Sequence, residues 1–77
     1  MNEEELKELA ERLKKEYPFG IPRKKIAEAT GHIYSPGTMA NLDSQGQGIP
    51  GRFRVGRQTV YPVESTLKFL KERISTE

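Results

Sequence analysis

The sequence predicts a small, mainly helical α+β domain in which four helices accompany a single β-hairpin. Apolar residues recur at helical spacing near both ends of the chain, and residues 52–55 alternate strictly between basic and apolar. Clusters of proline, glycine and serine separate these segments, as expected of turns between short elements. A chain of 77 residues is enough for one domain. We expect residues 1–19 to form an amphipathic helix packed on a domain spanning residues 20–77.

Composition removes several classes of function from consideration. The chain has no cysteine and one histidine, His32, so it offers neither a disulfide framework nor a set of metal ligands. No apolar run approaches the length of about 20 residues that a membrane span requires, and the acidic start is unlike a signal peptide. We therefore expect a cytoplasmic protein that is not an enzyme. It should have no catalytic residues, metal, cofactor, small-molecule substrate or membrane partner.

The first helix is predicted over residues 2–17, where Leu6, Leu9 and Leu13 share one face. Asn2 is suited to cap the first free amide groups, in a variant of the capping box. Because the leucine stripe must be buried, we expect the helix to pack on the rest of the domain; the alternative is a surface for a partner protein. Its outer face is acidic, so it should lie away from any bound nucleic acid.

Two short helices should follow. The first is predicted over residues 21–30, because proline favours an early helical position and Gly31 stands just past the end. The second is predicted over residues 35–43, with serine as the N-cap and proline in the first turn. The turn-rich run at residues 44–48 limits its length.

A hairpin and a last helix complete the predicted fold. The alternation in residues 52–55 predicts a half-buried strand. After a tight turn at residues 56–58 the chain returns as a second strand, which makes a β-hairpin. Phe53 and Val55 should point into the core, with the arginines of the strand on the opposite, solvent-facing side. Pro62 ends the hairpin and begins the last helix.

The order of these elements indicates a winged helix-turn-helix, α-α-α-β-β-α. Two short helices joined by a tight turn form a helix-turn-helix, and the hairpin directly after them is the wing. The formal net charge is only +2, but residues 1–17 hold six acidic and four basic groups (net −2) and residues 18–57 hold six basic and two acidic groups (net +4). Such asymmetry is a pointer to nucleic acid. The candidate phosphate contacts are Arg23, Lys24 and Lys25, and the candidate wing contacts are Arg52, Arg54, Arg57 and Gln58.

Four segments in this order resemble the MerR-like, excisionase-type winged helix-turn-helix domains, which include AlpA-like prophage regulators. Residues 21–31 resemble their first motif helix, residues 35–46 their recognition helix, residues 49–62 their wing and residues 63–73 the helix that follows. The resemblance implies binding to double-stranded DNA, as an excisionase-like recombination directionality factor or a small prophage-type transcriptional regulator. It also implies an integrase or a second copy of the chain as a further partner.

The proposed recognition helix departs from the family in its charge, because no Lys or Arg stands between residues 26 and 51. Base reading then falls to neutral groups: Asn41 can bond bidentately to adenine, and Thr38 can touch a thymine methyl. An ordinary exposed position is an equal alternative for Asn41. Asp43 is expected to form a local hydrogen bond or to pair with a wing arginine, because a carboxylate near phosphates is costly. The candidate contacts of this helix are Ser35, Gly37, Thr38, Asn41 and Ser44.

A second hypothesis needs no nucleic acid. The arginines of the hairpin suit phosphate contacts or a narrow minor groove, but they equally suit a solvated edge that discourages pairing between sheets. The alternative function is a protein-interaction module without enzymatic activity, whose basic wing contacts an acidic protein partner. Binding of duplex DNA separates the two hypotheses.

Overall fold

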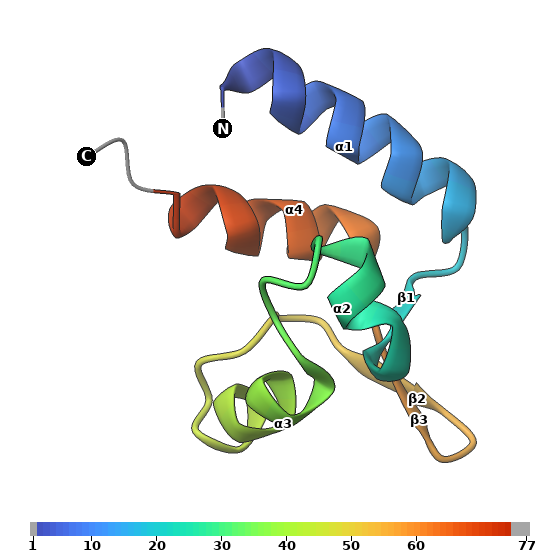
Figure 1. Ribbon diagram of the computed structural model, residues 1–77. Helices are drawn as coiled ribbons and strands as arrows, with labels where there is room; N and C mark the ends of the chain where they lie inside the picture. Colours follow the sequence, from blue (N-terminus) through green and yellow to red (C-terminus); the bar gives the residue numbers. More distant parts are fainter. Residues whose placement is uncertain (1, 75–77) are drawn as a thin grey trace.

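The computed structural model describes residues 2–74, which form a mixed α+β fold (Figure 1). The three strands make one antiparallel sheet in the order β1-β3-β2, and the helices pack around it. The elements are α1 (Glu3–Glu16), β1 (Ile21–Pro22), the 3₁₀ helix η1 (Arg23–Lys25), α2 (Ile26–Ala29), α3 (Pro36–Ser44), β2 (Phe53–Val55), β3 (Gln58–Tyr61) and α4 (Val63–Glu72).

The segment predicted to open the second helix is instead a strand. Ile21 pairs with Tyr61 and Pro22 with Val60, which adds β1 to the hairpin. Proline is tolerated here because β1 lies at the edge of the sheet. Gly20 makes the close approach possible, since its φ is +118° and a Cβ there would lie 2.7 Å from Val60 Cγ1. The prediction of a helix from residue 21 was therefore wrong, and helical structure begins only at η1.

Helix α1 packs along α4 (Figure 1), and Leu6 near its start lines a hollow with Ala10 and Leu67. Asn2 caps the helix as predicted, its Oδ1 accepting from the Glu5 amide at 2.8 Å. Leu13 is fully buried, and Leu9 is half-buried against the core. Near the C-terminal end of α1, Arg12 Nη2 donates to the Ala29 carbonyl at 3.1 Å, which connects α1 to the last residue of α2.

The core lies where α1, α2, α3, α4 and one face of the sheet meet. Tyr61 closes it from the sheet, and Phe69 of α4 stacks edge-on with Tyr34 at a centroid distance of 5.4 Å. The buried apolar residues are Leu13, Ile21, Ile26, Ala29, Met39, Ile49, Val60, Tyr61 and Phe69. Within residues 2–74 no helix combines the length and apolar character needed to cross a bilayer.

Helices α2 and α3 are joined by residues 30–35 rather than by a very short turn. Gly31 and His32 both adopt positive φ, +65° and +66°, a conformation in which histidine is one of the more tolerated side-chain-bearing residues. Thr30 Oγ1 donates to the Ile26 carbonyl and accepts from the Tyr34 amide. These bonds end α2 and direct the chain toward the start of α3.

The hairpin projects beyond the core. Val55 pairs with Gln58 across a two-residue loop, whose first residue, Gly56, has φ +62°, as in a type II′ turn. The expectation that Phe53 and Val55 point into the core was wrong, because they are 41% and 62% exposed. The alternation is real, but β2 lies outside the region that α1 and α4 cover, and only the end of β3 reaches the core.

Candidate nucleic-acid interface

Helix α3 presents an uncharged polar face. Ser35 caps it as predicted, its Oγ accepting from the Thr38 amide at 3.1 Å, and Pro36 occupies the first turn. Met39 and Asp43 point inward and are buried. All five residues predicted as recognition contacts are exposed, namely Ser35, Gly37, Thr38, Asn41 and Ser44.

Local hydrogen bonds already occupy some of these groups. Ser35 Oγ also donates to Thr38 Oγ1 at 2.9 Å, and Ser44 Oγ donates to the Asn41 carbonyl at 2.8 Å. The Asn41 side chain, by contrast, has no hydrogen bond to any part of the chain that the structure describes. Residues 38, 41 and 44 follow one another at three-residue spacing and therefore share a face of α3. Asn41 is the group on this face best placed to bond an external partner.

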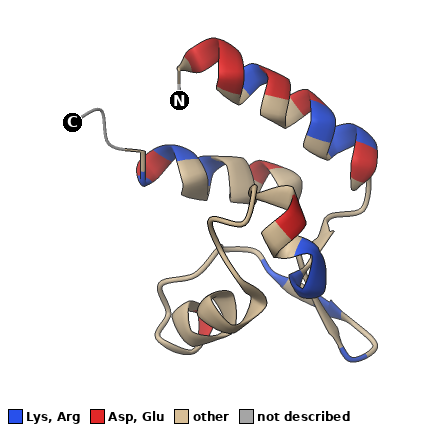
Figure 2. Cartoon of the chain, viewed as in Figure 1, with Lys and Arg blue, Asp and Glu red and all other residues tan. Residues whose placement is uncertain are grey.

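Basic residues lie at η1 and along the hairpin, and others lie on α1 and α4 (Figure 2). Lys24 and Lys25 of η1 are exposed, and Lys25 Nζ lies 3.7 Å from the exposed carboxylate of Glu28. The acidic first turn of α1 lies on the far side of the molecule from the hairpin tip in this view, whereas Glu16 at the other end of α1 lines a hollow with Val55 and Gln58. The four predicted hairpin contacts, Arg52, Arg54, Arg57 and Gln58, are all exposed.

A shallow hollow of about 250 Å³ joins η1, the start of α3 and the hairpin. None of the residues that line it, among those described, is acidic. The N-terminal end of α3 adds the partial positive charge of the helix dipole. An anion is therefore the ligand that this hollow favours. Its lining residues are Arg23, Lys24, Pro36, Arg57, Gln58 and Thr59.

Beside the hollow, a buried carboxylate holds the three elements together. Asp43 is only 6% exposed, and its Oδ2 accepts from Tyr61 Oη at 2.6 Å and from Arg23 Nη2 at 2.7 Å. Arg23 Nε donates to Tyr61 Oη at 2.9 Å, which closes a triangle between η1, α3 and β3. Arg52 Nε lies 4.0 Å from the same carboxylate oxygen. The expectation that Asp43 pairs with a wing arginine is thus confirmed, although Arg23 and Tyr61 are the closer partners.

The triangle changes the ionisation of its members. The hydrogen bond that Arg23 donates to Tyr61, and to a smaller extent the one that it donates to Asp43, raise the pKa of Arg23 above its ordinary value, so the guanidinium stays charged. Burial, followed by the hydrogen bond to Asp43, raises the pKa of Tyr61. Arg23 therefore differs from Lys24: its guanidinium is committed to the protein, whereas Lys24 is exposed.

Two residues of this arrangement were not among the predicted site residues. Tyr61 is fully buried in the core, and its hydroxyl also donates to Asp43. Gly48 lies against the carboxylate, because a Cβ at this position would overlap Asp43 Oδ1. Gly48 stands five positions after Asp43, beyond the end of α3 at Ser44.

Comparison of the chain with protein-family models, with curated proteins and with solved structures found no match.

Proposed function

We propose that the protein binds double-stranded DNA as a winged helix-turn-helix protein of the excisionase-like or small prophage-regulator type. In this proposal α2 and α3 are the motif helices, and the hairpin of β2, the turn and β3 is the wing. One observation carries the proposal: the hollow that Lys24, Pro36 and Arg57 line brings exposed cations to the start of an uncharged polar helix. Phosphate binding beside a base-reading helix needs this combination.

The docking that we propose places α3 in a major groove, which is wide enough to admit an α-helix. Asn41 would read adenine, and Thr38 would contact a neighbouring thymine methyl. Lys24 and Arg57 would then hold the phosphates at the edge of that groove. Arg54 lies on the same hairpin and would extend the phosphate contacts along the DNA strand. Lys25 would contact phosphate on the opposite side of the groove.

Arg23 has a positioning role in this proposal. Its guanidinium bonds Asp43 of α3 and Tyr61 of β3, so it fixes the recognition helix relative to the wing. The acidic helix α1 packs on α4, away from the hairpin tip (Figure 2). This arrangement supports the proposal because it keeps the acidic first turn of α1 away from the phosphate backbone.

The test is binding to duplex DNA over a range of salt concentrations. Four neutralised phosphates should give a log affinity that falls against log salt with a slope of about −3.6, at about −0.9 per phosphate. Lys24→Ala should reduce the slope by about 0.9 and leave the unfolding transition unchanged. Arg23→Ala is the variant to compare with Lys24→Ala. It should lower the stability of the fold, because Arg23 binds Asp43 and Tyr61. Absence of duplex binding at low salt would overturn the proposal.

Selection of bound duplexes from a random pool distinguishes an excisionase-like role from that of a transcriptional regulator. An excisionase-like role predicts repeated sites and strong bending of the selected DNA, with an integrase as a further partner. A regulator that acts as a dimer predicts a single palindromic operator, because the symmetry of the site mirrors that of the protein.

A further inference from the structure

An open hollow lies between the first half of α1 and the second half of α4. It measures about 890 Å³ and shares no lining residue with the hollow beside α3. Leu6, Ala10 and Leu67 are its apolar lining residues, and each of them is only half-buried. We call this hollow the α1–α4 groove. Apolar surface with charged residues around it marks a contact site, and DNA binding through α3 and the hairpin gives the groove no role.

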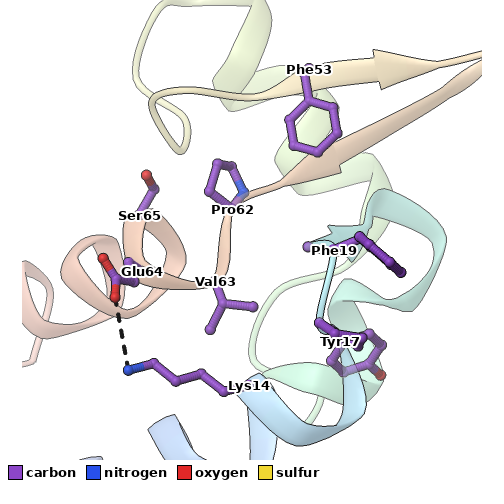
Figure 3. Close-up of a pocket in the computed structure, with 10 residues that line it drawn as sticks. Lys14, Tyr17, Phe19, Phe53, Pro62, Val63, Glu64 and Ser65 are labelled. Carbon is purple, nitrogen blue, oxygen red and sulfur yellow. Dashed lines mark ion pairs between the residues drawn. The ribbon is translucent and has the colours of Figure 1, made fainter.

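The charges along the groove follow a regular order. Helices α1 and α4 run antiparallel, so the start of α1 lies beside the end of α4 (Figure 1). At this end Glu3 and Glu4 of α1 line the groove together with Lys71 of α4. Past the other end, Lys14 Nζ of α1 lies 3.8 Å from Glu64 Oε1 of α4 (Figure 3). Along the groove, each helix is therefore acidic at the end where the other is basic, and basic where the other is acidic.

This order makes the groove complementary to itself. A two-fold axis that crosses the groove at right angles to the helices sets α1 antiparallel to α1 of a second copy, and α4 antiparallel to α4. Glu3 and Glu4 of each copy then face Lys14 of the other, and Lys71 faces Glu64, so that every pair occurs twice. The midpoint between positions 3 and 14 falls between residues 8 and 9, and that between positions 64 and 71 falls between residues 67 and 68. The apolar centre of the groove thus meets its own copy.

Two lysines near the centre select the direction of the axis and limit the affinity. Lys7 and Lys68 also line the groove. An axis parallel to the helices would set α1 of one copy over α4 of the other and bring these like charges together. With the perpendicular axis Lys7 faces Ala10 of the second copy, and the stem of Lys68 can cover apolar surface while its ammonium group reaches water.

The size of the surface indicates a weak and reversible contact. Two adjacent helices about 15–20 Å long and together about 20 Å wide cover about 300–400 Å² on each copy, which is at the low end of specific interfaces. A different protein would need two adjacent helices with the same antiparallel order of charges to match both sides of the groove. The second copy carries that order already, so charge complementarity favours it.

We propose that the α1–α4 groove binds a second copy of the chain, and that α1 and α4 of the two copies form an antiparallel four-helix bundle around a two-fold axis. The apolar centre provides the attraction, and the charges at the two ends fix the direction of the partner. The hollow beside α3 stays free in this dimer, because it shares no residue with the groove. The proposal does not depend on DNA binding.

Sedimentation equilibrium of the full-length chain without DNA tests the proposal. The average mass should rise from monomer toward dimer as the concentration approaches about 1 mM, and high salt should weaken the association. Because DNA is absent, the result is independent of the DNA-binding test. A parent chain that stays monomeric over this range, whether or not it binds DNA, would overturn the proposal.

A swap of charges tests the predicted arrangement. Lys14→Glu, and separately the double change Glu3→Lys with Glu4→Lys, should each weaken self-association about five-fold or more, because like charges then face each other. An equimolar mixture of these two variants should restore the dimer, since each copy then meets opposite charges. Lys15→Glu is the matched control on the far face of α1 and should associate like the parent. All four positions are exposed, so the variants should keep the fold. Equal association of Lys14→Glu and Lys15→Glu, or a mixture that stays monomeric, would contradict the proposal.

Discussion

The hydroxyl of Tyr61 donates a 2.6 Å hydrogen bond to Oδ2 of Asp43 and so joins the end of β3 to α3. Arg23 donates to both partners, which brings η1 into the same contact. The orientation of α3 relative to the hairpin therefore depends on one buried carboxylate. In a small domain, loss of such a group affects both stability and the surface that the two elements present.

Asp43→Ala should lower the free energy of unfolding by about 2–4 kcal/mol, because it leaves the Tyr61 hydroxyl and the Arg23 guanidinium without their acceptor. Urea denaturation measures the change. Asn41→Ala is the control: it removes an exposed side chain from the same helix and should stay within about 0.5 kcal/mol of the parent. Equal stability of the two variants would show that the triangle contributes nothing.

Stability should fall in alkaline solution through Tyr61. Burial, with the bond to Asp43, raises its pKa in the folded state above the ordinary value of 10.0. Between these two values the folded protein holds a proton that the unfolded chain has released, so the free energy of unfolding decreases as pH rises. The contribution is complete below pH 10.0 and is lost as pH rises through the folded-state pKa.

Urea midpoints measured from about pH 8 to about pH 11 test this dependence. Tyr61→Phe should be less stable than the parent at the lower pH and should lose less stability on going to the higher one. If parent and variant lose the same amount over this range, another group is responsible for the alkaline transition.

Gly48→Ala should destabilise the fold by about 1–3 kcal/mol, as expected of overpacking. The added Cβ would overlap Asp43 Oδ1 and stand 3.1 Å from the Cα of Asp43, so the carboxylate and the helix backbone would have to shift. Gly37→Ala is the matched control, because only Ser35 Oγ lies within 4.0 Å of the added Cβ. Alanine inside a helix should even stabilise it by about 0.5–1 kcal/mol. Thermal unfolding that ranks the two variants the other way would contradict this assignment.

Local signals predicted where α1 and α3 begin, but not where α2 begins. The caps Asn2 and Ser35 act within three residues of themselves, so the sequence alone identified the starts of α1 and α3. Strand β1 depends instead on pairing with Tyr61, forty residues away along the chain. Two residues carry no periodicity of their own, and a proline that begins a helix looks the same as a proline in an edge strand.

The candidate site was likewise predictable where it depends on local spacing, and not where it depends on contacts between distant residues. The exposed polar face of α3 follows from helical spacing, and all the residues predicted on it are exposed. The hydrogen-bond partners of Asp43 were harder to predict from the sequence, because Tyr61 and Arg23 lie 18 and 20 positions away along the chain. The exposure of Phe53 was also missed, since alternation shows that two faces differ but not that either is covered.

Arg57→Ala and Asn41→Ala should affect DNA binding in different ways. Arg57 lies at the exposed hairpin tip beside the anion-favouring hollow, so its loss should weaken all duplexes about equally and reduce the salt slope by about 0.9. Asn41→Ala should leave the slope unchanged and relax discrimination at one base pair by about 1–3 kcal/mol. Competition binding with the selected site, its single-base variants and random duplex measures both effects. Equal losses on selected and random DNA for both variants would refute the proposed division between phosphate contacts and base reading.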